Sequence, residues 1–516
     1  MRSILVSSAV LLFVLTSGPV APAADADASG MLLLHTRSRV ESPRQSGQFE
    51  VVYKPLTWDP KQTAIVICDM WDDHYCRNAA RRVAEMAPRM NKLVAAARKR
   101  GVLIIHSPSG TMDVYKDTPE RKLALEAPKA ELPTKHKGWA HLDPKREPPL
   151  PVDTSTPCDD VSPRKAVRMF SRQNDLVSIE PGDAIGDGVE IFNLLDQRGI
   201  KNVILMGVHT NMCVLGRPFG IRNMVYQGKN LVLCRDMTDA MYSPKCKPYV
   251  SHVRGTELVI EHIEKYWCPT ITGSDFLPQA AFRFKQDDRP HVVFLVNSNH
   301  YDADKTLAAF AHLLCDRYHC YCTILNIEDE TGNPGLEAIK AADCLVVFVR
   351  RRTLPEKQMA MLRAYLAAGK PLVALRTASH AFAVKSVPEG HAQWKSFDPE
   401  VLGGNYHGHG SNKQGTDVAI LPGAAGHPIL AGVKPAKWHS AASLYRVSPI
   451  DAKATVLLTG SLEGQTEPLA WTRSHRGGRV FYTGLGHQDD FQTPQFRRLL
   501  VNGIFWAMDR PVPEVE

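Results

Sequence analysis

Short apolar runs alternate with amphipathic stretches along most of this chain. Residues 63–68, 102–106 and 203–206 are almost continuously apolar, a pattern typical of strands buried on both faces. Between the first two runs, residues 83–99 repeat apolar side chains at helical spacing and end before Gly101. A strand, a helix and a second strand in this order predict a parallel sheet with a right-handed crossover.

The same alternation begins again after a polar stretch at residues 271–289, which we interpret as a linker. The chain has 516 residues, a length that suggests two or three domains. We therefore predict an α/β protein made of two doubly wound, three-layer α/β/α domains with mainly parallel sheets, at residues 55–270 and 290–512. In the second domain, buried strands are predicted at 291–296, 321–324, 344–349 and 371–375, with helices at 305–315 and 355–368.

The first residues have the composition of a targeting segment. Arg2 is followed by an apolar core at residues 4–15 and by small residues suited to cleavage. We predict that residues 1–24 are a signal peptide and that the mature protein is secreted or periplasmic. No later stretch is long and apolar enough to suggest a membrane span. Residues from the cleavage site to about Leu56 look irregular.

Charge and cysteine content narrow the function classes. The net charge of +8 is spread along the chain without a long basic block, which argues against nucleic-acid binding. The chain has eleven cysteines, an odd number, so at least one is expected to be unpaired. Cys315, Cys320 and Cys322 lie near two histidines, and we favour one disulfide among them over a metal site.

Residues 107–163 interrupt the alternation and are rich in proline, lysine and acidic residues. A connection of this length suggests a functional insertion or lid, from which Trp139, Lys135, Lys137 and His141 could reach an active site. The alternative is a solvated surface excursion. Residues 166–170 are predicted as the strand that follows.

Cys213 has the most distinctive setting for chemistry. The apolar strand 203–206 ends at Gly207, and Cys213 opens a predicted helix a few residues later. Unpaired N–H groups and the helix dipole would lower the pKa of such a thiol and could hold an oxyanion. The sequence context leaves a reactive nucleophile and a buried structural cysteine about equally supported.

Asp69 at a strand end, a basic residue at a later strand end and the segment Gly207–Cys213 together resemble the isochorismatase-like cysteine hydrolases. The resemblance covers about residues 60–270. It implies that Cys213 attacks an amide-type carbonyl, that Asp69 is the general base and that the Val208–His209 peptide bond is cis. The family's catalytic lysine is absent from its expected place, where Arg172 stands instead.

The same resemblance indicates the residues that would contact the substrate. Four candidates flank the predicted nucleophile and base: Trp71, His209, Asn211 and Met212. His74 and His106 lie near strand ends and suggest a remnant of the metal site that some members have, although the usual Asp-x-His pattern is missing.

The second half resembles the ThuA-like (trehalose-utilisation) family, which is built on a class I glutamine-amidotransferase-like fold. The matching stretches are 376–382, 402–407, 426–429 and 478–487. At the elbow where amidotransferases carry a cysteine, this chain has Arg376-Thr377-Ala378-Ser379, so glutamine hydrolysis is not expected. The resemblance associates this half with sugars.

Histidines recur near the strand ends of the second half. They could form a polar or metal-binding pocket, or they could be surface residues. We take His380, His407 and His487 as candidate ligand-binding residues, with His409 and His439 beside them. No cofactor is expected, although the histidines of the second half leave a bound metal as a possibility.

Two functions follow. The first is an exported hydrolase that uses Cys213 on an amide-type C–N bond of a small molecule, fused to a ThuA-like domain with a carbohydrate-related role. The second is a catalytically silent isochorismatase-like scaffold whose ThuA-like half binds or processes a sugar. A homo-oligomer is compatible with both.

Overall fold

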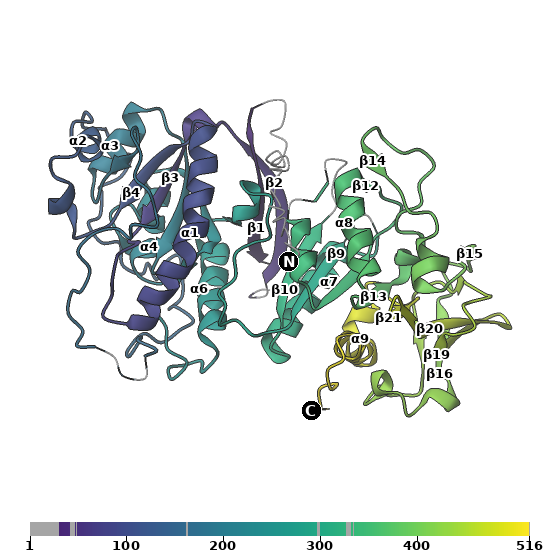
Figure 1. Ribbon diagram of the computed structural model, residues 1–516. Helices are drawn as coiled ribbons and strands as arrows, with labels where there is room; N and C mark the ends of the chain where they lie inside the picture. Colours follow the sequence, from purple (N-terminus) through teal and green to yellow (C-terminus); the bar gives the residue numbers. More distant parts are fainter. Residues whose placement is uncertain are drawn as a thin grey trace, which may run out of the picture.

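The computed structural model describes residues 30–41, 47, 49–160, 162, 164–296, 300–326, 332–333 and 335–514. The predicted signal peptide, residues 1–24, lies outside these ranges. The chain forms two α/β halves, each with its own sheet and core, placed side by side (Figure 1). This confirms the predicted fold class. Within the described residues, no helix combines the length and apolarity that a membrane crossing requires.

The first half is built on an eight-stranded sheet. Strands β3 to β8 run parallel, and β1 pairs antiparallel with both β8 and β2. The order across the sheet is β2 (Phe49–Trp58), β1 (Leu32–Glu41), β8 (Thr270–Ile271), β7 (Asn230–Asp239), β6 (Asn202–Val208), β3 (Thr63–Cys68), β4 (Leu103–Ser107) and β5 (Ala184–Ile185).

Helices cover both faces of this sheet, because successive strand residues point to opposite sides. Ile65 and Ile67 face α1 (Arg77–Lys99), whereas Ala64 and Val66 face the helices of the other layer. Those helices are α3 (Glu190–Gln197), α5 (Ile221–Tyr226) and α6 (His252–Tyr266), with the short α2 (Pro119–Leu125) and α4 (Cys213–Gly216) beside them.

The second half has a nine-stranded sheet of two kinds. Its order is β10 (Tyr321–Asn326), β9 (His291–Val296), β11 (Cys344–Phe348), β13 (Leu372–Leu375), β21 (Gly478–Thr483), β20 (Gln465–His475), β19 (Thr455–Leu462), β16 (Thr416–Ile420) and β17 (Lys437–Ser440). The first five strands are parallel and the last four join antiparallel. The expectation of a mainly parallel sheet therefore holds for only part of this half.

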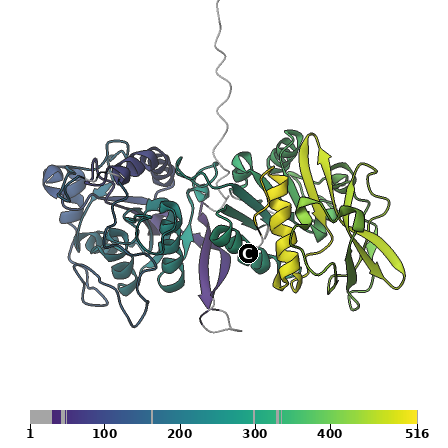
Figure 2. The same ribbon diagram turned by 90° about the horizontal axis from the view of Figure 1, so that it is seen from below.

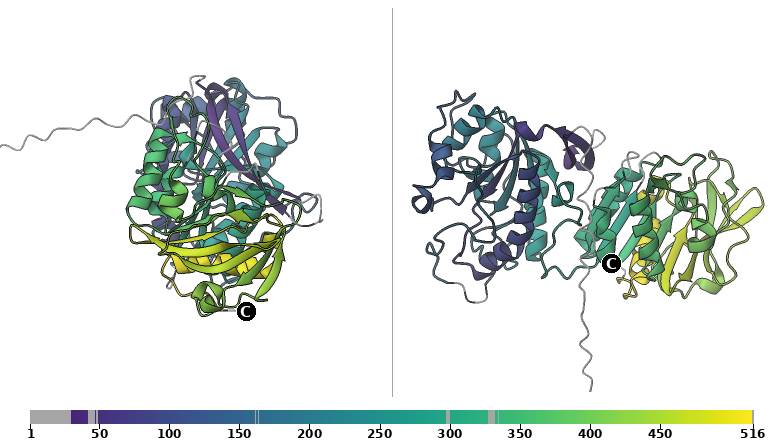
Figure 3. Two further views of the ribbon diagram at one scale, coloured as in Figure 1. Left: turned by 90° about the vertical axis from the view of Figure 1, so that its right-hand side faces the viewer. Right: turned by 45° about the horizontal axis from the view of Figure 1, so that its top comes forward.

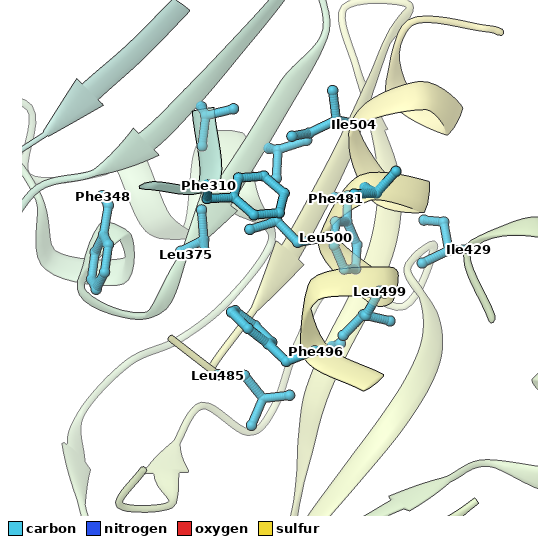
Figure 4. Packing of buried hydrophobic residues seen from close by; sticks show 14 of the residues in the cluster. Phe310, Phe348, Leu375, Ile429, Phe481, Leu485, Phe496, Leu499, Leu500 and Ile504 are labelled. Atoms are coloured by element: carbon cyan, nitrogen blue, oxygen red, sulfur yellow. The ribbon is translucent and has the colours of Figure 1, made fainter. Parts of the chain in front are cut away.

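One face of this sheet packs against α7 (Ala303–Arg317) and α9 (Pro494–Ala507), and the opposite face against α8 (Glu356–Ala367). Phe310, Phe481, Phe496 and Leu500 meet in the first of these layers (Figure 4). Two small two-stranded sheets lie outside the main one: β12 (Leu354–Pro355) with β14 (His391–Ala392), and β15 (Gly408–His409) with β18 (Tyr445–Arg446).

The amino-terminal segment differs from its predicted irregular conformation. β1 and β2 form a hairpin in which Leu32 is opposite Trp58, and alternate residues of β1 are buried. β2 also contacts α7, so the hairpin lies between the two halves (Figures 1 and 2). The sequence pattern missed it because only one face is apolar and the polar face carries several long charged side chains.

Ion pairs join the halves near this hairpin. Arg254 of α6 pairs with Asp316 of α7, and Arg289 pairs with Glu257 of α6. A cavity of about 200 Å³ lies among these elements. The predicted linker borders this cavity, and Asp236 accepts backbone N–H groups of Gly273 and Phe282 from it. The two halves and the region between them are also visible in Figure 3.

The prediction of a strand at residues 166–170 was wrong. This stretch is irregular, with Val167 46% and Met169 38% exposed, and the next strand of the sheet, β5, forms only at residues 184–185. The apolar side chains of residues 166–170 therefore do not indicate a strand. One of them, Phe170, packs on Trp71 instead.

Gly207 allows β6 to approach β3 at the point where the chain turns toward Cys213. Its φ is +104°, and a Cβ there would lie 2.0 Å from the carbonyl oxygen of Cys68. Gly207→Ala is expected to lower the free energy of unfolding of the first half by about 3 kcal/mol or more, from the backbone strain and the overlap combined. Denaturant unfolding measures it.

Gly228→Ala is the matched control, because Gly228 also has a positive φ, +72°, but nothing lies within 4 Å of a Cβ there. It should show only the smaller conformational penalty. Equal losses for both variants would contradict the close approach at Gly207.

Candidate active site

Asp69 lies at the carboxyl end of β3 and is completely buried. Its backbone has a positive φ of +48°, uncommon for a non-glycine residue. One carboxylate oxygen accepts the Ser109 N–H at 2.8 Å and the other accepts Arg217 Nε at 3.4 Å. Burial raises the pKa of Asp69, and the neighbouring Arg217 guanidinium opposes this rise. Asp69 is therefore a buried carboxyl group whose cationic partner is Arg217.

Cys213 begins α4 and is 7% exposed. Its thiol interacts with the Asp69 carboxylate, so the predicted nucleophile and base are brought together. Burial and the negative charge of Asp69 raise the pKa of this thiol, and Arg217 lowers it. The expectation of a lowered pKa was wrong, because α4 is a single turn whose dipole is small beside desolvation and a carboxylate.

Arg172 does not belong to this site. Its side chain is 54% exposed and pairs with Asp175, three residues later. The cation next to Asp69 is Arg217, four residues after Cys213 and just beyond α4. The sequence offered a signal for it, since a residue one helical turn after Cys213 returns to the same face. The expectation of a basic residue at a strand end led to Arg172 instead.

The loop between Gly207 and Cys213 shapes the surroundings of the thiol. The Val208–His209 peptide bond is cis, as the resemblance implied. The carbonyl of His209 accepts the N–H groups of Met212 and Val214. Among the described residues, the Cys213 N–H has no such partner, so it is the donor left for an oxyanion, while that of Met212 is occupied.

The four predicted substrate contacts differ in position. Trp71 donates its indole N–H to the Ser109 carbonyl, and Met212 is 41% exposed next to the nucleophile. His209 is buried, with its ring 5.0 Å from that of His74, and burial lowers its pKa to about 3. The Asn211 side chain exchanges two hydrogen bonds with the Met241 backbone. Asn211 therefore fixes the loop, with its oxygen and one of its two amide N–H donors already in use.

Two aromatic residues reach the site: Trp139 from the long insertion and Phe170 from the stretch that follows it. Phe170 stacks on Trp71 with ring centroids 4.0 Å apart. Trp139 covers Gly216, where a Cβ would lie 2.7 Å from the indole, and the Ala140 N–H donates to the Gly216 carbonyl. Lys137 instead lies over the Tyr226 ring. Part of the insertion thus covers the segment that carries the thiol.

The remnant metal site suggested by His74 and His106 is not assembled. His106 is buried, and both of its ring nitrogens are engaged, by Gln173 and Asp183. In the described part of the chain, the ligand atoms close enough to hold an ion belong to Cys76, Cys158 and Asp160. Both Asp160 oxygens already accept N–H groups at the start of α1.

All eleven cysteines are free, including Cys315, Cys320 and Cys322, so the predicted disulfide among these three is not formed. Cys315 and Cys322 are nevertheless neighbours, and burial and this contact raise the pKa of Cys322.

The candidate histidines of the second half do not converge on one point. His380 is buried and stacks on Tyr406 at 4.5 Å, and His487 lies 5.6 Å from the Tyr301 ring. His407 is exposed and contacts only a backbone carbonyl nearby. The other two, His409 and His439, are also exposed. Among the described residues, these histidines form no group able to hold a metal.

Comparison with known families agrees with this division. An isochorismatase domain model matches residues 63–245, and a model described as trehalose utilisation (ThuA) matches residues 292–507. The chain therefore carries an isochorismatase-like hydrolase domain followed by a ThuA-like domain. No curated protein matches it.

Solved structures resemble one half at a time. A ThuA-like protein from Bacteroides uniformis is 18% identical, with a TM-score of 0.34, over 44% of this chain and 94% of its own. A cysteine hydrolase from Pseudomonas syringae is 16% identical, with a TM-score of 0.26, over 42% and 92%. An isochorismatase family protein from Burkholderia thailandensis is 15% identical, with a TM-score of 0.25, over 42% and 93%.

The charges beside Cys213 make its reactivity testable. Asp69→Asn removes the anion that disfavours the thiolate, so the thiol pKa should fall and alkylation by iodoacetamide should accelerate about tenfold for each unit of pKa. Arg217→Gln removes the stabilising cation and should slow the reaction. Mass spectrometry of the Cys213 peptide between pH 6 and 10 measures both rates.

Arg172→Gln is the control for loss of an arginine and should leave the rate unchanged. The half-buried Cys158 of the same samples reports general changes in accessibility. If Arg172→Gln slowed the reaction as much as Arg217→Gln, the assignment of the cation would be wrong.

Proposed function

We propose that this chain is an exported hydrolase whose first domain cleaves an amide-type C–N bond of a small molecule with Cys213 as the nucleophile. The observation that carries the proposal is the meeting of Asp69, Cys213 and Arg217 at one buried point. They come from the end of β3, the start of α4 and the residue that follows α4. Such a site at the carboxyl ends of parallel strands is where α/β folds bind ligands.

The raised pKa of Cys213 favours a protonated thiol at rest, next to Asp69, whose carboxylate form Arg217 stabilises. Asp69 takes the proton as the sulfur attacks the carbonyl carbon, so a thiolate never has to accumulate. The C–S bond forms, and the carbonyl electrons become an oxyanion near the Cys213 N–H. As the C–N bond breaks, Asp69 returns the proton to the departing amine.

Water completes the cycle. Asp69 removes a proton from a water molecule as it attacks the thioester, and the C–S bond breaks to release a carboxylic acid and the thiol. Arg217 keeps its proton throughout, because a guanidinium does not ionise in this pH range. Its part is therefore electrostatic: it holds Asp69 in the carboxylate form and stabilises negative charge on the sulfur.

A catalytically silent scaffold was the alternative, and it rested on the absence of the family's lysine. Arg217 supplies the missing positive charge from another position, which favours the catalytic hypothesis. The stacked Trp71 and Phe170 and the covering Trp139 support a small substrate with a flat or apolar part.

For the ThuA-like domain we propose a carbohydrate-related role by binding. Arg376 occupies the turn after β13, where a nucleophile would be needed for glutamine hydrolysis. The sugar association rests on the description of the matching family model.

Cys213→Ala should lower kcat/KM for the best substrate in a panel of small amides, ureas and N-carbamoyl compounds by at least about 10³-fold, because the covalent route is lost. Cys246→Ala is the matched control, a buried cysteine of the same domain that interacts with Thr156 instead. Unchanged turnover in Cys213→Ala would place the chemistry elsewhere.

Export is tested separately. Expression of the full chain in a double-membraned bacterium should give a periplasmic protein whose first residue, by intact mass, lies between 24 and 27, because small residues there suit cleavage. Replacing Leu11 and Leu12 by Asp within the apolar core is the control and should retain the full-length chain in the cytoplasm. An unprocessed cytoplasmic wild-type protein would overturn the export proposal.

A further inference from the structure

Arg376 places a positive charge inside the second half without a carboxylate partner. It follows β13, begins the 3₁₀ helix Arg376–His380 and is 1% exposed. Its guanidinium donates to the Gly484 carbonyl at 2.8 Å, the Ser443 hydroxyl at 2.9 Å and the Tyr301 hydroxyl at 3.2 Å. Among the described residues no acidic side chain pairs with it. Buried charges are normally paired, since desolvation costs several kcal/mol.

Two aromatic rings compensate part of this charge. The Arg376 guanidinium lies 4.6 Å from the centroid of Tyr301 and 4.5 Å from that of Tyr445. Cation–π contacts of this kind are strongest when the cation is shielded from water, as it is here. The rings attract the cation but carry no negative charge, so the net charge of the site stays positive.

More positive charge lies at the end of the neighbouring strand. Arg350 and Arg351 follow β11, and in the described structure neither forms an ion pair. Burial, together with Arg351, Arg350 and Arg376, lowers the pKa of His380 to about 3, so its imidazole is neutral. The backbone N–H of Arg351 donates to the His380 carbonyl at 3.1 Å, so Arg351 lies beside the short helix that Arg376 begins.

Two acidic residues that follow β21, Asp489 and Asp490, are already engaged. Asp490 accepts the N–H groups of Gly486 and His487 with one oxygen and the Ser440 hydroxyl with the other. Asp489 lies 3.4 Å from His487 and is the partner of that imidazole rather than of the arginines.

Two buried side-chain nitrogens in this region also lack hydrogen-bond partners. Neither Arg376 Nε nor His300 Nδ1 has a hydrogen-bond partner among the described residues. Tyr301, Arg350, Arg376 and His487 follow β9, β11, β13 and β21, so the group gathers where the parallel strands end. This is the edge at which such sheets bind ligands.

We propose that the carboxyl edge of the parallel strands in the ThuA-like domain binds a small molecule through a carboxylate or phosphate group, with Arg351 and Arg376 as the charges that attract it. The oxyanion supplies the negative charge that this edge lacks and an acceptor for Arg376 Nε, which has none in the described structure. The site is separate from Cys213 and does not depend on hydrolysis there.

Isothermal titration of the full chain with inorganic phosphate, and separately with acetate, tests the site at constant ionic strength maintained with sodium chloride. Saturable binding of at least one anion is expected. Phosphate binding alone identifies a phosphoryl group, and acetate binding identifies a carboxylate. No saturable binding of either anion overturns the proposal.

Arg351→Gln should weaken binding at least tenfold. Arg476→Gln is its matched control: both arginines are exposed with a positive φ, +48° and +52°, but Arg476 precedes β21 at the opposite edge of the sheet. Equal affinities in these two variants also overturn the proposal. Arg376→Gln should abolish binding if circular dichroism shows it folded; because Arg351 is exposed, its variant decides the question alone if Arg376→Gln does not fold.

Discussion

The ion pair between Asp69 and Arg217 is the constraint on which the first half depends. A fully buried carboxylate is tolerated only when a cation and hydrogen-bond donors replace the water that it has lost. Arg217 and the Ser109 N–H do so here, and each comes from a different part of the chain. Arg217 also lies 5.7 Å from the Trp139 ring centroid, and Trp139 lies against Gly216 of α4, so the same guanidinium contacts the residues that cover the thiol segment.

Much of the architecture could be predicted from the apolar pattern, because parallel strands buried on both faces leave a clear signal. The strands near residues 63–68, 203–206 and 291–296 formed as expected. The amino-terminal hairpin was missed because one of its faces carries charged residues. The antiparallel strands β16 to β20 were missed because their pairing is a property of the sheet rather than of any one segment.

The site was predictable to the extent that motifs carry it. Asp69 and Cys213 follow strand ends, and sequence alone connects such residues to a common edge. The cation was misplaced, because Arg172 and Arg217 are equally basic in sequence and differ only in which one faces the carboxylate. The thiol pKa was mispredicted for a similar reason, since desolvation depends on burial that no local pattern reports.

The hairpin between the halves sets an order of assembly. Arg37 of β1 pairs with Thr270 of β8, more than two hundred residues later in the chain. The first strand of the sequence can therefore join the sheet only after most of the first domain has formed. A fragment that starts at β3 would expose the edge of β8 and lose the surface against α7. Separating the two domains for independent study therefore requires a boundary that keeps this ribbon with the first one.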